Sequence, residues 1–394
     1  MTPGSMYVHV PNQAWLTLAS PWYTMLMFKR SLNKTKKPFA PRVKYWLKNY
    51  KKLSIILGIL LVLIAAGGTA TAVYFLNQDP EVVATSKPEV KPEPTPEPPK
   101  YYSPLSGNQV ETEAATHAAV TGIMMENSPD ARPQSGLKDS GVVFEAIAEG
   151  GITRFLVLYQ EQKPQLIGPV RSVRQYYVDW VAGFNASVAH VGGSAAALKE
   201  VRNGNYRDID QFFNASTYWR ATDRYAPHNV YTSFEKIDAL NAKKGFTTSE
   251  FTGFTRKDSV AATPTATSVD VKISGPLFNS HYNYNATTNT YDRSQAGKPH
   301  LDREAGQISP RSVVVMKVNQ VKVFEDGYRE QIDAIGSGAA TIFQDGTVQE
   351  VTWKKASKTA QITFTDAAGK DVPLARGQTW LTAVPNGSGS VTWQ

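Results

Sequence analysis

The sequence predicts an α+β protein in which an N-terminal transmembrane helix precedes two folded domains outside the membrane. Three observations lead to this prediction: an uncharged apolar run at residues 53–76, a proline-rich stretch after it, and a change of hydrophobic pattern near residue 270. The first domain, residues 101–244, combines short apolar runs with a helical stripe, which is typical of an α/β-type mixed sheet. The second, residues 270–394, alternates apolar and polar residues, which is typical of antiparallel β structure. Within it, Asp326-Gly327 and Asp345-Gly346 predict tight hairpin turns.

The basic charge of the protein is concentrated at its N-terminal end. Residues 1–52 hold ten Lys or Arg and no acidic residue, although the net charge of the whole chain is +8. Basic flanks stay in the cytoplasm, so we expect residues 1–52 inside the cell, residues 53–76 in the membrane and the rest outside. A cleaved signal peptide is the alternative, because Ala70-Thr71-Ala72 resembles a cleavage site. A nucleic-acid partner is not expected, because the remaining chain has no basic excess.

Composition also defines two connecting segments. Residues 77–100 contain seven prolines among Glu and Lys, which favours an extended, semi-rigid linker. Residues 245–269 are rich in Thr, Ser and Lys and are predicted to be an inter-domain loop. The sequence has no cysteine, which excludes disulfides, thiolate catalysis and lipid attachment to a cysteine. We predict no metal and no cofactor, because the histidines are scattered and lack a ligand-like spacing.

The stretch from Glu149 to Ser194 contains the most informative local patterns. Residues 155–159 are predicted to form a buried strand, and residues 172–184 an amphipathic helix. Residues 188–191 are predicted to form a second strand, which the turn at Gly192, Gly193 and Ser194 connects to a helix at 195–201. A glycine turn before a helix leaves backbone N–H groups free, so an anion is expected to bind there.

Several longer motifs together resemble one protein family. They are ARPQSGL (131–137), EGGITRF (149–155), IGPVRSVR (167–174), HVGGS (190–194), APHNVYTS (226–233), YDRSQAGKPHLD (291–302), WKK (353–355) and GQTWL (377–381). This set resembles the YerB-like family of bacterial cell-envelope lipoproteins, a two-part domain of unknown function. The resemblance implies an exported α+β protein and supplies no reaction or ligand. Members of the family are typically anchored by a lipidated cysteine, and here the predicted helix takes that place.

The polar residues of these motifs are the predicted ligand-binding site. Arginine binds carboxylate or phosphate through two parallel hydrogen bonds, so converging arginines would form an anion pocket. Structural ion pairs with Glu145, Glu149, Asp179 and Asp223 are the alternative role for these arginines. The predicted site residues are Arg132, Glu149, Arg154, Arg171, Arg174, His190, Ser194, Arg220, Arg224, His228, Asn229 and Tyr231.

Three functions are compatible with these patterns. The first is a non-enzymatic envelope protein that binds an anionic cell-wall component or a wall-remodelling partner. The second is a cell-wall hydrolase or transferase that uses His190, His228 and Glu149 as acid–base groups, with Glu149 or Asp223 orienting a histidine and Ser194 as a candidate nucleophile. The third is a protein-interaction module whose motifs hold its two domains together.

Overall fold

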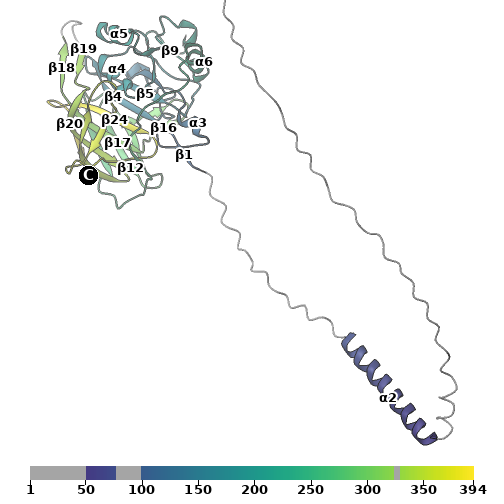
Figure 1. Cartoon of the computed structure of the whole chain (residues 1–394). Helices are drawn as coiled ribbons and strands as arrows, with labels where there is room; N and C mark the ends of the chain where they lie inside the picture. The colour runs from purple at the N-terminus through teal and green to yellow at the C-terminus, as the bar shows by residue number, and fades with distance from the viewer. Residues whose placement is uncertain (1–49, 77–98, 324–328) are drawn as a thin grey trace, which may run out of the picture. The chain divides into compact units, whose positions relative to one another are not determined.

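The computed structural model describes residues 50–76, 99–323 and 329–394 of the chain (Figure 1). Two compact units are distinguished, residues 1–95 and residues 96–394. The predictions for residues 1–49, for most of the linker 77–100 and for a turn at Asp326 and Gly327 lie outside the described residues.

Helix α2 (Lys51–Leu76) forms where the apolar run was predicted to be helical. Among the helices of the described residues, none combines the length and the hydropathy needed for crossing a membrane. The structure therefore does not support the prediction of a transmembrane helix at residues 53–76.

The second unit is mostly β structure with few helices. Its described residues contain a twelve-stranded mixed sheet, here called the central sheet. The strands along the sheet are, in order, β22 (Thr363–Thr365), β21 (Thr347–Lys355), β20 (Gly336–Gln344), β17 (Ser312–Val318), β24 (Thr379–Pro385), β4 (Val142–Glu149), β5 (Ile152–Tyr159), β3 (Thr121–Glu126), β6 (Ser187–Ala189) and β7 (Arg207–Asp208). Off this path lie β18 (Gln320–Val323) and β19 (Arg329–Ile332), and β19 also pairs with β4.

A second, antiparallel sheet of five strands and several two-stranded pairs complete the described β structure. The five strands are β14 (Lys298–Pro299), β13 (Thr290–Gln295), β12 (Ser280–Asn285), β11 (Ser268–Lys272) and β25 (Ser390–Trp393). The pairs are β1 (Tyr101–Tyr102) with β2 (Gln109–Val110), β8 (Trp219–Arg220) with β9 (Val230–Tyr231), β10 (Arg256–Lys257) with β23 (Leu374–Ala375), and β15 (Leu301–Asp302) with β16 (Gly306–Gln307). The helices are α3 (Glu113–Thr116), α4 (Gln175–Ala182), α5 (Ala195–Val201) and α6 (Phe234–Lys244), with short 3₁₀ turns η1 (Pro129–Ala131) and η2 (Ala215–Thr217).

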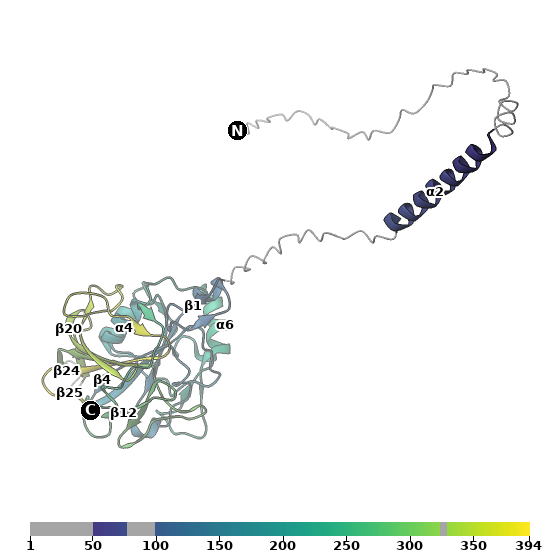
Figure 2. The ribbon, with the colours of Figure 1, turned by 90° about the horizontal axis from the view of Figure 1, so that it is seen from below.

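The central sheet joins the two predicted domains. Strand β24 of the second half pairs in parallel with β4 of the first half, with Thr379 opposite Val142 and Thr382 opposite Glu145. Both views of the ribbon show these two strands side by side (Figures 1 and 2). Both strands are buried along almost their whole length, so the two halves share their apolar interior.

Strand β5 shows how the sheet is covered on both faces. Leu156 and Leu158 belong to one apolar cluster, whereas Phe155, Val157 and Tyr159 belong to the other. Successive side chains of a strand point to opposite faces, so each face of the sheet has its own core. A strand buried on both faces is continuously apolar in sequence, which explains the unbroken run at residues 155–159.

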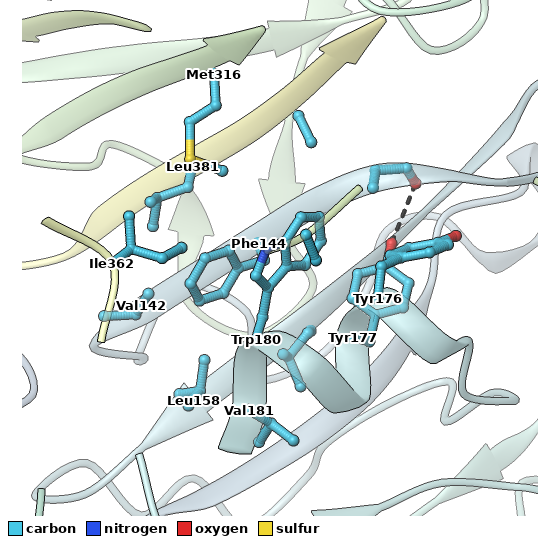
Figure 3. Close-up of a cluster of buried hydrophobic side chains, with 14 of the residues drawn as sticks. Val142, Phe144, Leu158, Tyr176, Tyr177, Trp180, Val181, Met316, Ile362 and Leu381 are labelled. Carbon is cyan, nitrogen blue, oxygen red and sulfur yellow. Dashed lines mark hydrogen bonds between the residues drawn. The ribbon is translucent and has the colours of Figure 1, made fainter. Parts of the chain in front are cut away.

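Helix α4 covers one face of the central sheet and lies within the predicted helix at 172–184. Trp180 of α4 stacks on Phe144 of β4, with ring centroids 5.2 Å apart and an interplanar angle of 13° (Figure 3). The hydroxyl of Tyr177 donates to the carbonyl oxygens of Ala146 and Arg154, at 3.1 and 2.7 Å. Aromatic packing and these hydrogen bonds fix the helix above the strands that carry Glu126, Glu149 and Arg154.

The structure confirms two predictions that rest on residues close together in the sequence. Helix α5 spans Ala195–Val201, the residues predicted for it. The hairpin between β20 and β21 turns at Asp345 and Gly346, whose φ angles are 55° and 75°. Asp-Gly suits a tight turn that needs two positive φ angles, which is why this turn can be predicted from the sequence.

Candidate functional site

Two adjoining pockets of the second unit bring together residues from both halves of the chain. They share Asp223 and Arg303, whose side chains form an ion pair of 2.6 Å between them. The first, here called the charged pocket, has a volume of about 650 Å³ and is lined by Asp130, Pro133, Asp223, Arg224, Tyr225, Ala226, His228 and Arg303. The second, here called the aromatic pocket, has a volume of about 410 Å³ and is lined by Leu166, Trp219, Arg220, Ala221, Thr222, Asp223, Tyr231, Arg303 and Glu304.

His228 is held at the charged pocket by a buried carboxylate. Its Nδ1 lies 2.9 Å from Oε1 of Glu126 and 3.2 Å from Oγ of Ser128. Its Nε2 lies 4.0 Å from Oδ2 of Asp130, which is 82% exposed. In the neutral ring the carboxylate accepts the Nδ1–H, so Nε2 carries the lone pair on the solvent side. This nitrogen is therefore placed to accept a proton or a hydrogen bond from a bound group.

The orienting partner of His228 differs from the two that the sequence suggested. Glu149 and Asp223 were predicted for this role, but Glu126 fills it. Asp223 pairs with Arg303 instead. The predicted pairing was wrong because Glu126 lies 102 residues from His228 in sequence, on the end of strand β3.

Arg224 carries a guanidinium that backbone carbonyls orient, and, after the hydrogen bond from Arg303, its charge helps to lower the pKa of nearby Asp223. Its guanidinium donates to two backbone carbonyls, those of Asp130 at 3.0 Å and Pro133 at 2.5 Å. Within the described residues, no Asp or Glu lies at ion-pair distance from Arg224. Two hydrogen bonds to carbonyls fix the direction of the guanidinium while leaving its charge available to a ligand.

Glu149 lies between two buried arginines rather than beside a histidine. Arg154 contacts Glu149 Oε1 at 2.5 Å, and Arg174 pairs with Oε2 of the same carboxylate. Burial by itself would raise the pKa of Glu149, but the two guanidinium groups hold it below its ordinary value. The three residues form a structural cluster, which is the alternative role that the sequence suggested for these arginines.

A third pocket, of about 370 Å³, lies beside Arg174 and Ser194. Arg329 also lines it, but so do Asp179, Glu330 and Asp333, so an anion would meet more carboxylates than guanidinium groups there. Ser194, the predicted nucleophile, caps helix α5, because its Oγ accepts a hydrogen bond from the N–H of Ala197. The anion site expected at this helix start therefore has no support from its surroundings.

His190 belongs to a separate buried network. Its Nδ1 lies 2.8 Å from the carbonyl oxygen of Gly192 and its Nε2 lies 3.0 Å from Oδ1 of Asp208. The ring is 0% exposed, and buried Asp210 lies 3.8 Å from Nδ1. Both ring nitrogens are engaged, so His190 orders the loop after β6 and shares no partner with His228.

Three more of the predicted residues, Arg220, Asn229 and Tyr231, lie at or beside the aromatic pocket. Arg220 donates to Oδ1 of Asn229 at 2.7 Å across the pair β8 and β9. Tyr231 is 1% exposed and stacks on Trp219, with ring centroids 6.5 Å apart. Asn229 is itself buried and donates to the carbonyls of Ala221 and Arg224. Arg220 and Tyr231 therefore reach the aromatic pocket, whereas Asn229 supports it.

The side chains of Arg132 and Arg171 bind partners within the protein itself. Arg171 Nε lies 3.3 Å from Oε1 of Glu126, behind His228. Arg132 donates to Asn127 and to the carbonyl oxygen of Leu277. Burial, together with the nearby charge of Arg293, lowers the pKa of Arg132 to about 10. The predicted arginines thus do not converge on one pocket, because most of them satisfy buried partners.

Sequence reasoning missed Glu126, Arg303 and a fully buried ion pair between Glu145 and Arg293. Oε2 of Glu145 accepts from Arg293 at 2.9 Å and from the indole N–H of Trp380 at 3.0 Å. Glu145 does take part in a structural ion pair, but its partner is Arg293 and not one of the arginines suggested for that role, so the predicted pairing was wrong. Arg303 directly follows the YDRSQAGKPHLD motif, and this proximity is the one signal that could have identified it.

Comparisons with known proteins agree with this architecture. Residues 105–247 match the family described as "Protein of unknown function (DUF3048) N-terminal domain", and residues 269–381 match its C-terminal domain. "Putative lipoprotein YerB" of Bacillus subtilis (strain 168) is 33% identical over 293 residues, which cover 73% of this chain and 87% of that protein. A crystal structure of the YerB protein from Bacillus subtilis matches with a TM-score of 0.67 at 31% identity, covering 74% of this chain and 100% of that one. The resemblance seen in the motifs is confirmed, and the chain belongs to the DUF3048 family of YerB-like proteins.

Proposed function

We propose that this protein is a membrane-tethered, extracytoplasmic envelope protein whose charged pocket binds a cell-wall component that carries anionic groups. The single observation behind the proposal is Arg224, a guanidinium oriented by two carbonyls and free of any carboxylate partner among the described residues. Arg303 lines the same pocket and adds further donors, and His228 adds an acceptor at its Nε2. Carboxylate and phosphate groups are the ligands that such an arrangement favours.

The location outside the cell is proposed from a relative and from the sequence. The relative from Bacillus subtilis bears the name "Putative lipoprotein YerB", and a lipid anchor attaches a protein to a membrane. This chain has no cysteine, and residues 53–76 carry no charge. We expect the full chain to sediment with membranes and residues 96–394 alone to stay in the supernatant. Protease added to intact cells should degrade residues 96–394; their protection until lysis would contradict the proposed side of the membrane.

A sedimentation assay with isolated cell walls tests the binding. Residues 96–394, which form a compact unit, are mixed with walls and the bound fraction is measured against salt. Arg224→Gln should reduce binding by at least about tenfold, because a charge-assisted contact contributes roughly 1.5–3 kcal/mol and each 1.4 kcal/mol is about tenfold. Arg376→Gln is the matched control, because Arg376 pairs with Asp258 and does not line either pocket. Equal binding by wild type and Arg224→Gln would remove the charged pocket as the site.

A second candidate function, acid–base chemistry on the bound group, is favoured by the pair of Glu126 and His228. The side chain of Glu126 is 4% exposed and that of His228 is 22% exposed, which is the arrangement of an oriented base. Incubation of walls with the protein, followed by analysis of released fragments, tests this function. Release that is lost in His228→Gln while wall binding persists would support it. The absence of any release by the wild-type protein would leave binding alone.

A further inference from the structure

We propose that the two pockets take the two halves of one ligand, a sugar in the aromatic pocket and a peptide that carries both ammonium and carboxylate groups in the charged pocket. The ligand class is therefore a glycopeptide fragment of the wall. This inference rests on the proposed function, since it takes the charged pocket as the binding site. The two pockets are contiguous through the ion pair of Asp223 and Arg303, which lines both of them.

The aromatic pocket has the chemistry that a sugar ring requires. Trp219 lines it and is fixed in place by stacking on the buried ring of Tyr231, with an interplanar angle of 27°. Arg220, Thr222 and Glu304 line the same pocket and offer donors and acceptors for hydroxyl groups. A flat apolar ring with a polar rim matches the apolar face and polar edge of a pyranose.

The charged pocket is balanced rather than basic, and this selects the second half of the ligand. It is lined by the cations Arg224 and Arg303 and by the anions Asp130 and Asp223. Arg303 and Asp223 neutralise each other, which leaves Arg224 and Asp130 as the available charges. A polyphosphate would be repelled by Asp130, and a neutral glycan would leave both charges unmatched. A peptide with a free carboxylate and a free ammonium group satisfies both.

Titration calorimetry of residues 96–394 with a matched ligand series tests the inference. The probes are a disaccharide-peptide from digested peptidoglycan whose peptide carries a free amino group, the free peptide, the free disaccharide, the same disaccharide-peptide acetylated at its amino groups, and poly(glycerol phosphate). We expect the intact disaccharide-peptide to bind at least about tenfold more tightly than each of the other four probes. Acetylation removes the ammonium charge without removing the carboxylates, so it isolates the contribution of Asp130.

Variants assign each half of the ligand to its pocket. Trp219→Ala should reduce the affinity for the disaccharide-peptide to that for the free peptide, and Asp130→Asn should abolish the effect of acetylation. Trp393→Ala, at another partly exposed tryptophan outside both pockets, is the control and should change neither affinity. Arg220→Ala replaces Trp219→Ala if the latter does not fold, as judged by circular dichroism.

The outcomes separate this inference from the proposed function. Disaccharide-peptide binding that is no tighter than peptide or disaccharide binding would overturn the two-pocket inference. Preferential binding of poly(glycerol phosphate), lost in Arg224→Gln, would overturn it as well while leaving the proposed function intact. Failure of every wall probe to bind, or binding unaffected by Arg224→Gln, would overturn both.

Discussion

Glu126 and His228 lie 2.9 Å apart, the same distance that separates a second carboxylate–imidazole pair, Glu250 and His117. The first carboxylate is 4% exposed, whereas the second is 68% exposed. Burial therefore distinguishes two pairs that are otherwise alike in geometry. The stabilisation that burial gives to the pair of Glu126 and His228 can therefore be measured against the exposed pair.

The first prediction uses this contrast. Glu126→Ala should lower the free energy of unfolding by about 1–3 kcal/mol, because it leaves His228 and Arg171 without their buried acceptor. Glu250→Ala should change it by less than about 1 kcal/mol, because an exposed pair is screened by water. Urea unfolding of residues 96–394 measures both. Similar losses in the two variants would show that the burial of Glu126 does not matter.

The second prediction concerns the ion pair between Glu145 and Arg293, both of which are 0% exposed. Arg293→Ala should destabilise the protein by about 3–5 kcal/mol, because it leaves a buried carboxylate without its counter-ion. Arg376→Ala removes a partner of a largely exposed carboxylate and should have a much smaller effect. Chemical unfolding curves provide the comparison. If Arg293→Ala lowers the free energy of unfolding as little as the control does, the ion pair between Glu145 and Arg293 does not stabilise the association of the two halves.

The third prediction is a pH dependence caused by Glu149. Arg154 and Arg174 outweigh burial and lower its pKa in the folded state below the ordinary value of 4.5. The stabilisation is therefore present above the unfolded pKa and is lost as the pH falls through the folded pKa. Glu149→Gln should have a lower free energy of unfolding than the wild type at pH about 6. This difference in free energy should shrink as the pH falls to about 3.

Urea midpoints at several pH values check the behaviour of Glu149. Glu350→Gln, at an exposed position of strand β21, is the matched control and should show little difference at any pH. A difference between wild type and Glu149→Gln that stays constant from neutral to acid pH would rule out the proposed origin.

The fourth prediction concerns the turn at Gly346. Its φ is 75°, and a Cβ placed there would lie 2.7 Å from Cε1 of Tyr284. Gly346→Ala should cost about 1–2 kcal/mol from the left-handed backbone alone. Gly387→Ala is the control, because a Cβ at Gly387 meets nothing within 4 Å. Thermal unfolding of both variants distinguishes them, and equal melting temperatures would contradict the turn's role in the β20–β21 hairpin.

Local patterns were sufficient for elements whose stability depends on near neighbours in sequence. Helix α5 and the turn at Asp345 and Gly346 are of this kind, since a cap or a positive φ acts within a few residues. Strand β5 could also be predicted from its apolar run, because burial on both faces requires an unbroken apolar sequence. Motifs identified the family, and His228 and Tyr231 of the two pockets lie within them, but Trp219 and Arg220 do not.

The tertiary structure alone decided which polar residues are free to bind a ligand. Arg154, Arg171 and Arg174 resemble Arg224 in sequence, but each of the three has a carboxylate partner, whereas Arg224, among the described residues, donates to backbone carbonyls. The partner of Arg154 lies just across the β4–β5 hairpin, but those of Arg171 and Arg174 lie on strands farther away along the chain. The pairing of β4 with β24 likewise joins segments more than 200 residues apart. The charge on a side chain is a property of the sequence, but its neutralisation depends on long-range contacts that only the folded chain creates.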